Sequence, residues 1–126
     1  MSGDNFILDT NIVLYLLNGD ETLSELLDSK NLYISFINEI ELLGYHKITK
    51  KEKHEIKQFI DDCLVIEMNN EIKKHAINIR NHHNPKLGDC LIAATAIHAD
   101  FPFISSDKGF SKIKELNLIQ YKISGQ

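Results

Sequence analysis

The chain alternates short continuous apolar runs with longer stretches in which apolar residues recur every three or four positions. Five short runs predict buried strands at 6–8, 32–35, 64–67, 102–105 and 118–121. The longer stretches predict helices near 11–18, 20–29, 37–44, 49–63, 70–82 and 88–99. We expect Thr10 or Asn11 to cap the first of these helices, and Pro85 to break the chain before the last.

Strands that alternate with helices indicate an α/β fold. Because parallel strands need crossover connections, which are right-handed, the pattern predicts a central parallel five-stranded sheet flanked by helices in α/β/α layers. The chain has 126 residues, which is enough for one hydrophobic core but not for two. We find no linker or internal repeat, so we expect a single domain over residues 1–126.

Composition and charge narrow the functional classes. The formal charge is 14 − 18 = −4, which does not suggest a general nucleic-acid binder, although basic residues can gather locally. No stretch approaches the roughly 18 to 20 apolar residues of a membrane span, and Asp4 and Asp9 interrupt the order of a signal peptide. Cys63 and Cys90 are too few for a disulfide framework and lack metal-binding spacing. We therefore expect a cytoplasmic protein with two buried thiols and no membrane contact.

Four acidic residues lie where an apolar strand meets a helix, or at the start of a helix facing such a junction. Asp9 ends the first strand, Glu41 lies in the helix after the second, Asp89 opens the last helix and Asp107 follows the fourth strand. Ligands of open parallel sheets bind at the carboxyl ends of the strands. Carboxylates about 5 Å apart repel by roughly 3 kcal/mol per pair at an effective dielectric of about 20, so such a cluster needs cations. Oxygen ligands favour Mg²⁺ or Mn²⁺, which predicts a metal-dependent enzyme of phosphoryl transfer.

Helix capping is the alternative explanation for the three aspartates, because Asp is a preferred N-cap and negative charge suits a helix N-terminus. Capping does not explain Glu41, which lies inside its helix. In that helix we expect Ile37, Ile40 and Leu43 to form the buried stripe, with Glu41 beside it and Glu39 farther round. The gathering of all four acids at one edge of the sheet favours a functional site.

Four segments, in order, resemble the PIN domain, the nuclease fold of VapC-type toxins. They are FILDTN at 6–11, SFINEIELLG at 35–44, GDCLIAATA at 88–96 and ISSDKGF at 104–110. Each segment alone is a weak signal, whereas the four in this order span most of the chain. The resemblance implies a ribonuclease that uses one or two Mg²⁺ or Mn²⁺ ions to cleave single-stranded RNA.

The resemblance also assigns roles to individual residues. Asp9, Glu41 and Asp89 match the invariant acids of the family, and Asp107 matches its more variable fourth acid. On this basis all four are expected to be catalytic and to hold the metal.

Residues that would orient these acids follow from the same resemblance. Ser105 matches a hydroxyl position of the family, and Thr10 and Asn11 are expected to act in the same way. Asn38 is a departure, because many toxins of this kind carry Thr or Ser there. The departure leaves the acids intact and affects only the residues around them.

Basic residues are candidates for contacts with the RNA backbone. Lys50 and Lys51 lie in a lysine-rich helix, and Lys108 follows the fourth acid. Phosphate contacts by such residues would guide the strand. The alternative is a solvated face balanced by Glu52 and Glu55.

The VapC-type resemblance further implies protein partners. We expect a homodimer, inhibited by a small antitoxin that covers the acidic cleft and whose Arg would reach Asp9 or Asp107. An apparent surplus of apolar helix positions supports this expectation, at Leu14, Leu17, Leu42 and Leu43.

Other classes explain the motifs less well. A phosphatase of the haloacid-dehalogenase type needs a second Asp two residues after the first, where this chain has Asn11. A receiver domain needs a pair of acids ahead of its phosphorylated Asp, which is lacking. A catalytically idle PIN module would have no use for four clustered acids. A housekeeping RNA-processing nuclease remains an alternative, although the small size favours a toxin.

Overall fold

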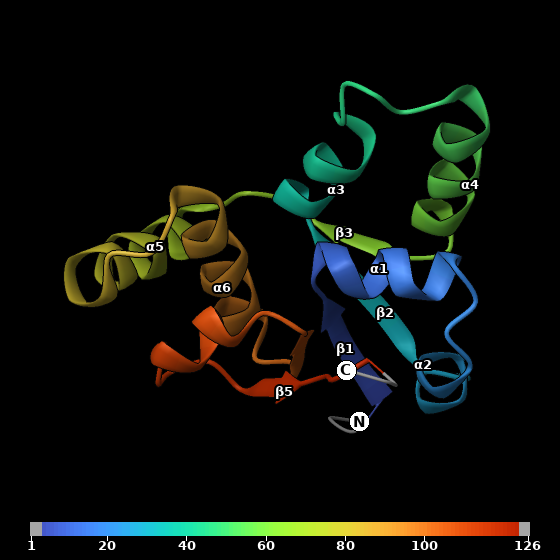
Figure 1. Ribbon diagram of the computed structural model, residues 1–126. Coiled ribbons are helices and arrows are strands. Elements are labelled where there is room, and N and C mark those ends of the chain that lie inside the picture. The colour runs from blue at the N-terminus through green and yellow to red at the C-terminus, as the bar shows by residue number, and fades with distance from the viewer. Residues whose placement is uncertain (1–3, 124–126) are drawn as a thin grey trace.

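The computed structural model describes residues 4–123 and has the alternating strands and helices expected from the sequence (Figure 1). Each predicted strand is present, with ends shifted by at most one residue. The elements, in chain order, are β1 (Asn5–Leu8), α1 (Thr10–Leu17), α2 (Glu21–Leu26), β2 (Asn31–Ser35), α3 (Phe36–Leu43), α4 (Lys50–Asp61), β3 (Leu64–Ile66), α5 (Asn70–His83), α6 (Leu87–Ala99), β4 (Phe103–Ser105), the 3-10 helix η2 (Lys108–Lys112) and β5 (Leu118–Gln120).

The five strands form one parallel sheet in the order β3-β2-β1-β4-β5, which confirms the predicted sheet. β1 lies in the middle, with Ile7 opposite Tyr33 of β2 and Leu8 opposite Ile104 of β4. The chain moves outward from β1 to β2 and β3, and then returns to the other side of β1 for β4 and β5. The strand order therefore reverses between β1 and β4. In open parallel sheets this switch point, beyond the carboxyl ends of the strands, is where ligands bind.

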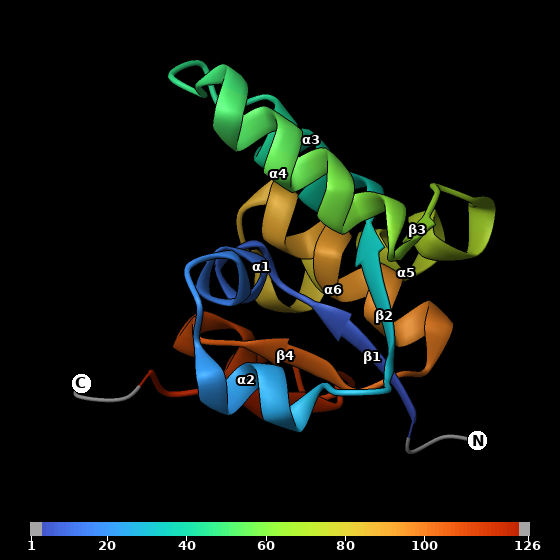
Figure 2. The same cartoon turned by 90° about the vertical axis from the view of Figure 1, so that its right-hand side faces the viewer.

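Hydrophobic cores on both faces of the sheet account for the α/β/α layers. Successive strand residues point to opposite faces. Ile7 and Phe103 pack against α5 and α6, whereas Leu8 and Ile104 pack against α1, α2 and α4. Figure 2 shows α1, α2 and α4 in front of the sheet, with α5 and α6 behind it. All residues of 92–96 in α6 are buried, as its apolar sequence predicts.

The ends of two helices differ from the prediction. Asp9, instead of Thr10 or Asn11, caps α1. Asp20 caps α2, which ends at Leu26, three residues before the predicted end. None of the helices within residues 4–123 is long and apolar enough to cross a membrane.

The buried face of α3 also differs from the predicted stripe. Asn38 and Leu42 are 0% and 3% exposed, whereas Ile40 is 62% exposed. Ile37 and Leu43 are partly buried. Because α3 starts directly after β2, its first turn points a polar residue back at the strand end, so the expected burial of Ile40 is wrong.

Candidate active site

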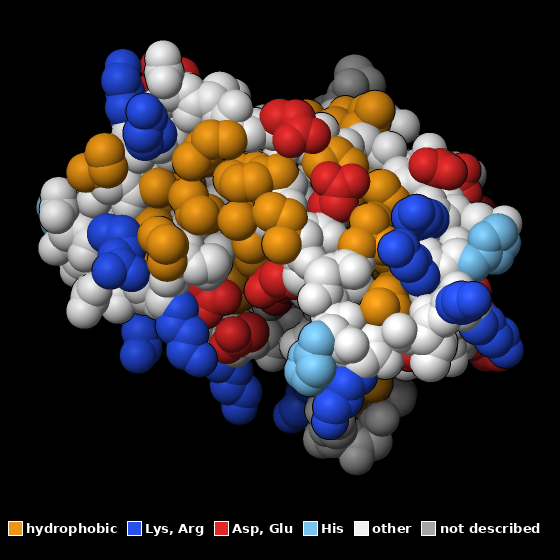
Figure 3. Space-filling model, turned by 90° about the horizontal axis from the view of Figure 1, so that it is seen from above, with side chains coloured by type: hydrophobic (Ala, Val, Ile, Leu, Met, Phe, Trp, Pro, Cys, Tyr) orange, Lys and Arg blue, Asp and Glu red, His pale blue; other side chains and the backbone are white. Residues whose placement is uncertain are grey.

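The four acids come from different elements that meet at the carboxyl edge of the sheet. Asp9 follows β1 and Asp107 follows β4, so both lie at the switch point, while Glu41 lies on α3 and Asp89 in the first turn of α6. Figure 3 looks onto this edge and shows acidic side chains beside a broad hydrophobic area. A Cβ added at Gly88 would lie 4.0 Å from Glu41 Oε2, which places that carboxylate over the start of α6.

Asp9 is the most enclosed of the four carboxylates, at 7% exposure. Its Oδ2 accepts a hydrogen bond from Ser105 Oγ at 2.7 Å, and its Oδ1 accepts one from the backbone N–H of Thr10 at 2.9 Å. Burial raises the pKa of Asp9 most, the two hydrogen bonds lower it, and the negative charges of Glu41 and Asp89 raise it. The net result is a raised pKa, so the charged form of this carboxylate is incompletely compensated by its surroundings.

A chain of hydrogen bonds beneath Glu41 connects α3 to α1. Ser35 Oγ donates to Asn38 Oδ1 at 2.8 Å, and Asn38 Nδ2 donates to Thr10 Oγ1 at 2.9 Å. Thr10 Oγ1 in turn donates to Glu41 Oε1 at 2.6 Å. Ser35 and Asn38 are both 0% exposed. The chain therefore fixes one oxygen of an exposed carboxylate from a fully buried polar pair.

Sequence reasoning did not select Asn38 as a site residue and treated it only as a departure from the PIN pattern. A local signal was nonetheless present. A hydroxyl residue followed three positions later by a side chain that can accept a hydrogen bond is the capping-box arrangement. Ser35 and Asn38 form both halves of such a box at the start of α3.

Asp89 and Asp107 line one cavity at the edge of the site. Asp89 is half-buried and does not cap α6, because Lys86 occupies the N-cap position. Burial raises the pKa of Asp89, Asp107 and Glu41 raise it further, and Lys86 lowers it. Asp107 is exposed and caps η2, with its Oδ1 accepting from the Gly109 N–H at 2.8 Å.

Ser105 links two of the acids. Its Oγ donates to Asp9 Oδ2 and accepts from the backbone N–H of Asp107 at 3.0 Å. Because Ser105 is fully buried at the end of β4, this hydroxyl fixes Asp9 relative to the loop that carries Asp107.

Oxygen donors of this kind suit a hard divalent cation, but the side chains as arranged do not form a closed metal site. Within residues 4–123, no three Asp, Glu, His or Cys side chains converge closely enough to hold one ion. Asp9, Glu41 and Asp107 each accept hydrogen bonds from different donors of the chain. The effects of the acids on the pKa values of Asp9 and Asp89 show that the four are electrostatic neighbours. The structure thus gathers the four predicted residues but lacks the preformed cluster expected from the sequence.

The remaining predicted residues lie at or beyond the edge of this site. Asn11 is exposed, and its side chain forms no hydrogen bond with any of residues 4–123. Lys108 is exposed at the start of η2, next to Asp107. Lys50 and Lys51 are exposed in the first turn of α4 and line neither of the two cavities that border on the acids.

A second cavity, of about 310 Å³, borders on Glu41 and is mostly apolar. Thr10, Leu14 and Tyr45 contribute to its wall. Of the four leucines that suggested an apolar surface, Leu14 and Leu42 line this cavity and are 38% and 3% exposed, and the other two, at 17 and 43, are half-buried. The predicted apolar surplus is therefore real at Leu14 but wrong at Leu42, which belongs to the core.

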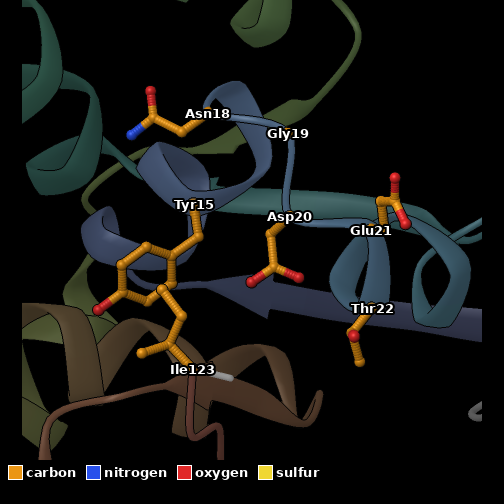
Figure 4. A pocket seen from close by; sticks show the side chains of 7 residues that line it. All are labelled: Tyr15, Asn18, Gly19, Asp20, Glu21, Thr22 and Ile123. Atoms are coloured by element: carbon orange, nitrogen blue, oxygen red, sulfur yellow. The ribbon is translucent and has the colours of Figure 1, made fainter. Parts of the chain in front are cut away.

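A larger cavity, of about 560 Å³, lies away from the acids, where α1 ends and α2 begins (Figure 4). Figure 4 shows Tyr15 and Ile123 next to each other, across from Asp20. The Asp20 carboxylate accepts hydrogen bonds from Tyr121 Oη at 3.0 and 2.8 Å and from the Leu23 N–H at 3.0 Å. None of the four predicted acids lines this cavity, so it lies apart from the candidate active site.

Comparisons with known proteins show which structures and which family this chain resembles. No curated protein sequence matches the chain. Among solved structures, VapBC2 from Rickettsia felis bound to a promoter DNA fragment is similar with a TM-score of 0.84 at 20% identity, covering 94% of this chain and 99% of that chain. A toxin–antitoxin complex from Klebsiella pneumoniae has a TM-score of 0.77 at 24% identity, covering 93% and 98%. VapBC-1 from nontypeable Haemophilus influenzae has a TM-score of 0.74 at 25% identity, covering 92% and 97%. The family model of the PIN domain matches residues 6–116, and the chain belongs to the PIN domain family.

Proposed function

We propose that this chain is a metal-dependent endoribonuclease that cleaves single-stranded RNA as the toxin of a toxin–antitoxin pair. One observation carries the proposal: four carboxylates from separate elements are electrostatic neighbours at the carboxyl edge of the sheet, where burial and neighbouring negative charge raise the pKa of Asp9 and Asp89. Acids perturbed in this way are typical of functional sites. PIN domains are usually nucleases, which supports the reaction class.

The donor set fits one or two Mg²⁺ or Mn²⁺ ions, because it consists of carboxylate oxygens. Asp9 is buried and held by two hydrogen bonds, so it serves as the fixed ligand. Glu41 and Asp107 are exposed and Asp89 is half-buried, so their side chains have room to turn towards it. Giving up a hydrogen bond to a charged group costs about 1.5–3 kcal/mol. Carboxylates brought to about 5 Å repel by roughly 3 kcal/mol per pair, and the attraction of a dication for each of them would offset both this repulsion and the lost hydrogen bond.

In the proposed reaction, hydroxyl side chains hold the negatively charged carboxylates in position. When bound, the cation would supply Lewis-acid stabilisation of the negative charge that develops on the phosphate oxygens. The hydrogen bond from Ser105 favours the ionised form of Asp9, in opposition to burial. Thr10 holds Oε1 of Glu41, while Oε2 of the same carboxylate lies over the start of α6. Ser105 thus holds Asp9 in place, whereas Thr10 holds one oxygen of Glu41 and leaves the other able to turn towards a cation.

The proposed antitoxin would bind beside the acids. Structures with a similar fold are those of toxin–antitoxin complexes. The apolar cavity next to Glu41 exposes Leu14 and Tyr45 at 38% and 53%, which a partner side chain can bury. An arginine of the same partner would pair with Asp9 or Asp107 and exclude the cation. We also propose a homodimer as the active unit.

The catalytic part of the proposal is tested with purified chain and a labelled single-stranded RNA. Cleavage should require Mg²⁺ or Mn²⁺, stop in excess chelator and be much slower on DNA of the same sequence. Asp89→Asn, purified in parallel, controls for contaminating ribonuclease. Full cleavage in chelator, or equal cleavage by Asp89→Asn, would overturn the assignment.

The toxin part is tested by expressing the chain alone and with the product of the adjacent short reading frame. Growth arrest that the second protein relieves supports a toxin, whereas normal growth in both cases supports the housekeeping alternative. Tyr45→Asp should weaken inhibition by the partner while leaving RNA cleavage intact. Unchanged inhibition of Tyr45→Asp would place the antitoxin elsewhere.

A further inference from the structure

The cavity that contains Asp89 and Asp107 also has a basic wall. Its volume is about 330 Å³, and Lys86, Lys112 and His83 line it together with the two acids. Figure 3 shows Lys or Arg side chains directly beside acidic ones on this face. The net charge of the chain is −4, so basic side chains gathered beside two acids of the candidate active site suggest a function of their own.

Close ion pairing with the acids does not occupy these lysines, although the charge of Lys86 lowers the pKa of Asp89. Lys86 and Lys112 are exposed, and neither forms an ion pair with another of residues 4–123. His83 is the basic residue of this wall that has an acidic partner, with its Nε2 3.6 Å from Glu115 Oε1. The two lysines therefore remain able to bind an external anion.

Hydrogen bonds fix the backbone at Lys86. Asn84 ends α5 in the left-handed region at a φ of 47°, and Arg80 Nη1 donates to Pro85 O at 2.9 Å, which fixes the turn before Lys86. Lys86 O accepts from the Cys90 N–H at 2.9 Å and so begins α6, three residues before Asp89.

Lys112 is fixed through the 3-10 helix that it ends. Phe110 of η2 is 2% exposed and packs edge-to-face on Phe103 of β4, with ring centroids 5.0 Å apart. The N–H of Ile113 donates to Phe110 O at 3.1 Å. Phosphate contacts fix the register of a bound strand when they come from rigid positions.

We propose, on the basis of the function proposed above, that this cavity is a nucleotide subsite. It holds one nucleotide of the RNA next to the phosphate that is cleaved, with Lys86 and Lys112 contacting the phosphates of that nucleotide. The volume, at the lower end of the roughly 300–1,000 Å³ range of ligand pockets, suits about one nucleotide. The strand then runs over the α5–α6 turn and η2, and not over the first turn of α4 with Lys50 and Lys51.

The test measures RNA binding without cleavage. In an Asp9→Asn background, the affinity for a short fluorescein-labelled single-stranded RNA is followed by fluorescence anisotropy over a series of salt concentrations. Each phosphate contact contributes about 0.7 to the slope of log K against log salt for single strands, so Lys86→Ala with Lys112→Ala should reduce the slope by about 1.4. With Asp9 intact, the same two changes should raise KM and leave kcat nearly unchanged.

Two pairs of variants serve as controls, with the same change in net charge. Lys57→Ala with Lys73→Ala alters two exposed lysines of α4 and α5 that line neither cavity beside the acids. Lys50→Ala with Lys51→Ala tests the α4 path. Both pairs should keep the original slope.

The outcomes separate this inference from the proposed function. RNA that is bound and cleaved with an unchanged slope in the Lys86 and Lys112 pair overturns the subsite alone. An equal loss in the Lys57 and Lys73 pair also overturns it, because the effect would then come from overall charge. A chain that neither binds nor cleaves RNA overturns the proposed function, and the subsite with it.

Discussion

Replacing Asn38 by alanine should weaken the fold, because this fully buried side chain connects Ser35 to Thr10. Asn38→Ala removes the hydrogen bonds that Oδ1 accepts from Ser35 N and Oγ, at 3.0 and 2.8 Å, and the one that Nδ2 donates to Thr10 Oγ1. Two donors of Ser35 are then left without an acceptor at a position that is 0% exposed. Each unsatisfied buried donor costs about 1–3 kcal/mol, so we expect the free energy of unfolding to fall by about 3 kcal/mol.

Asn38→Asp tests positioning at a pH at which urea unfolding shows the variant to be folded, because a carboxyl group is costly to bury. The new side chain keeps the shape and the acceptor oxygen that Ser35 needs, but in its ionised form it cannot donate to Thr10. It would instead compete with Glu41 for the one hydroxyl proton of Thr10, which now goes to Glu41 Oε1 at 2.6 Å. Residues that hold metal ligands in place typically change affinity or activity by about 10- to 100-fold when altered. We expect Asn38→Asp to lose turnover on this scale.

The assay combines urea unfolding with rates of RNA cleavage, and Asn78→Ala is the control. Asn78 is exposed on α5, where alanine has the higher helix propensity, so that variant should be neutral or slightly more stable. If Asn38 acts through Thr10, then adding Asn38→Asp to Thr10→Val should lower the rate little further than Thr10→Val alone. Asn38 variants that unfold and cleave like the control would show that Asn38 does not position Glu41, as would fully additive losses.

Three further changes test the acids themselves. Glu41→Gln should slow cleavage by at least about a hundredfold, the scale of losing a well-placed electrostatic group, whereas Glu39→Gln should have little effect; the reverse result at saturating Mg²⁺ would show that the wrong face of α3 is assigned. The pKa of Asp9 is raised in the fold, so its ionised form destabilises the native state increasingly as the pH rises through that pKa. Asp9→Asn should therefore melt higher than the unmodified chain at neutral pH, and the difference should vanish below about pH 4; a lower melting temperature at neutral pH would contradict this. Ser105→Ala removes the hydroxyl that joins Asp9 Oδ2 to the Asp107 N–H and should reduce the cleavage rate by about tenfold or more, with unchanged rates counting against its role.

The strands were predictable because each one is a short apolar run with a polar stop, and all five lie on a buried parallel sheet. The error at Ile40 has a physical cause. Apolar periodicity places hydrophobic residues towards the core, whereas the start of α3 is decided by the capping box of Ser35 and Asn38. That box points a polar side chain inward and leaves Ile40 62% exposed.

The position of the candidate site was also predictable, because parallel strands bring their carboxyl ends to one edge. The bonding of individual side chains was not. Nothing in the local sequence indicates that Thr10 donates to Glu41, since the two are 31 positions apart and meet only through the packing of α1 and α3. The same holds for Lys86 and Lys112, which share a cavity through the placement of the α5–α6 turn beside η2.

If the four acids hold a divalent cation, isothermal titration of the metal-free protein with Mn²⁺ will detect its binding. We expect one or two ions to bind per chain, and we expect Asp9→Asn, which removes the fixed ligand, to abolish or strongly weaken this binding. Glu39→Gln, two residues earlier on α3, should bind Mn²⁺ like the unmodified chain. Absence of Mn²⁺ binding, or equal binding by Asp9→Asn, would contradict the account.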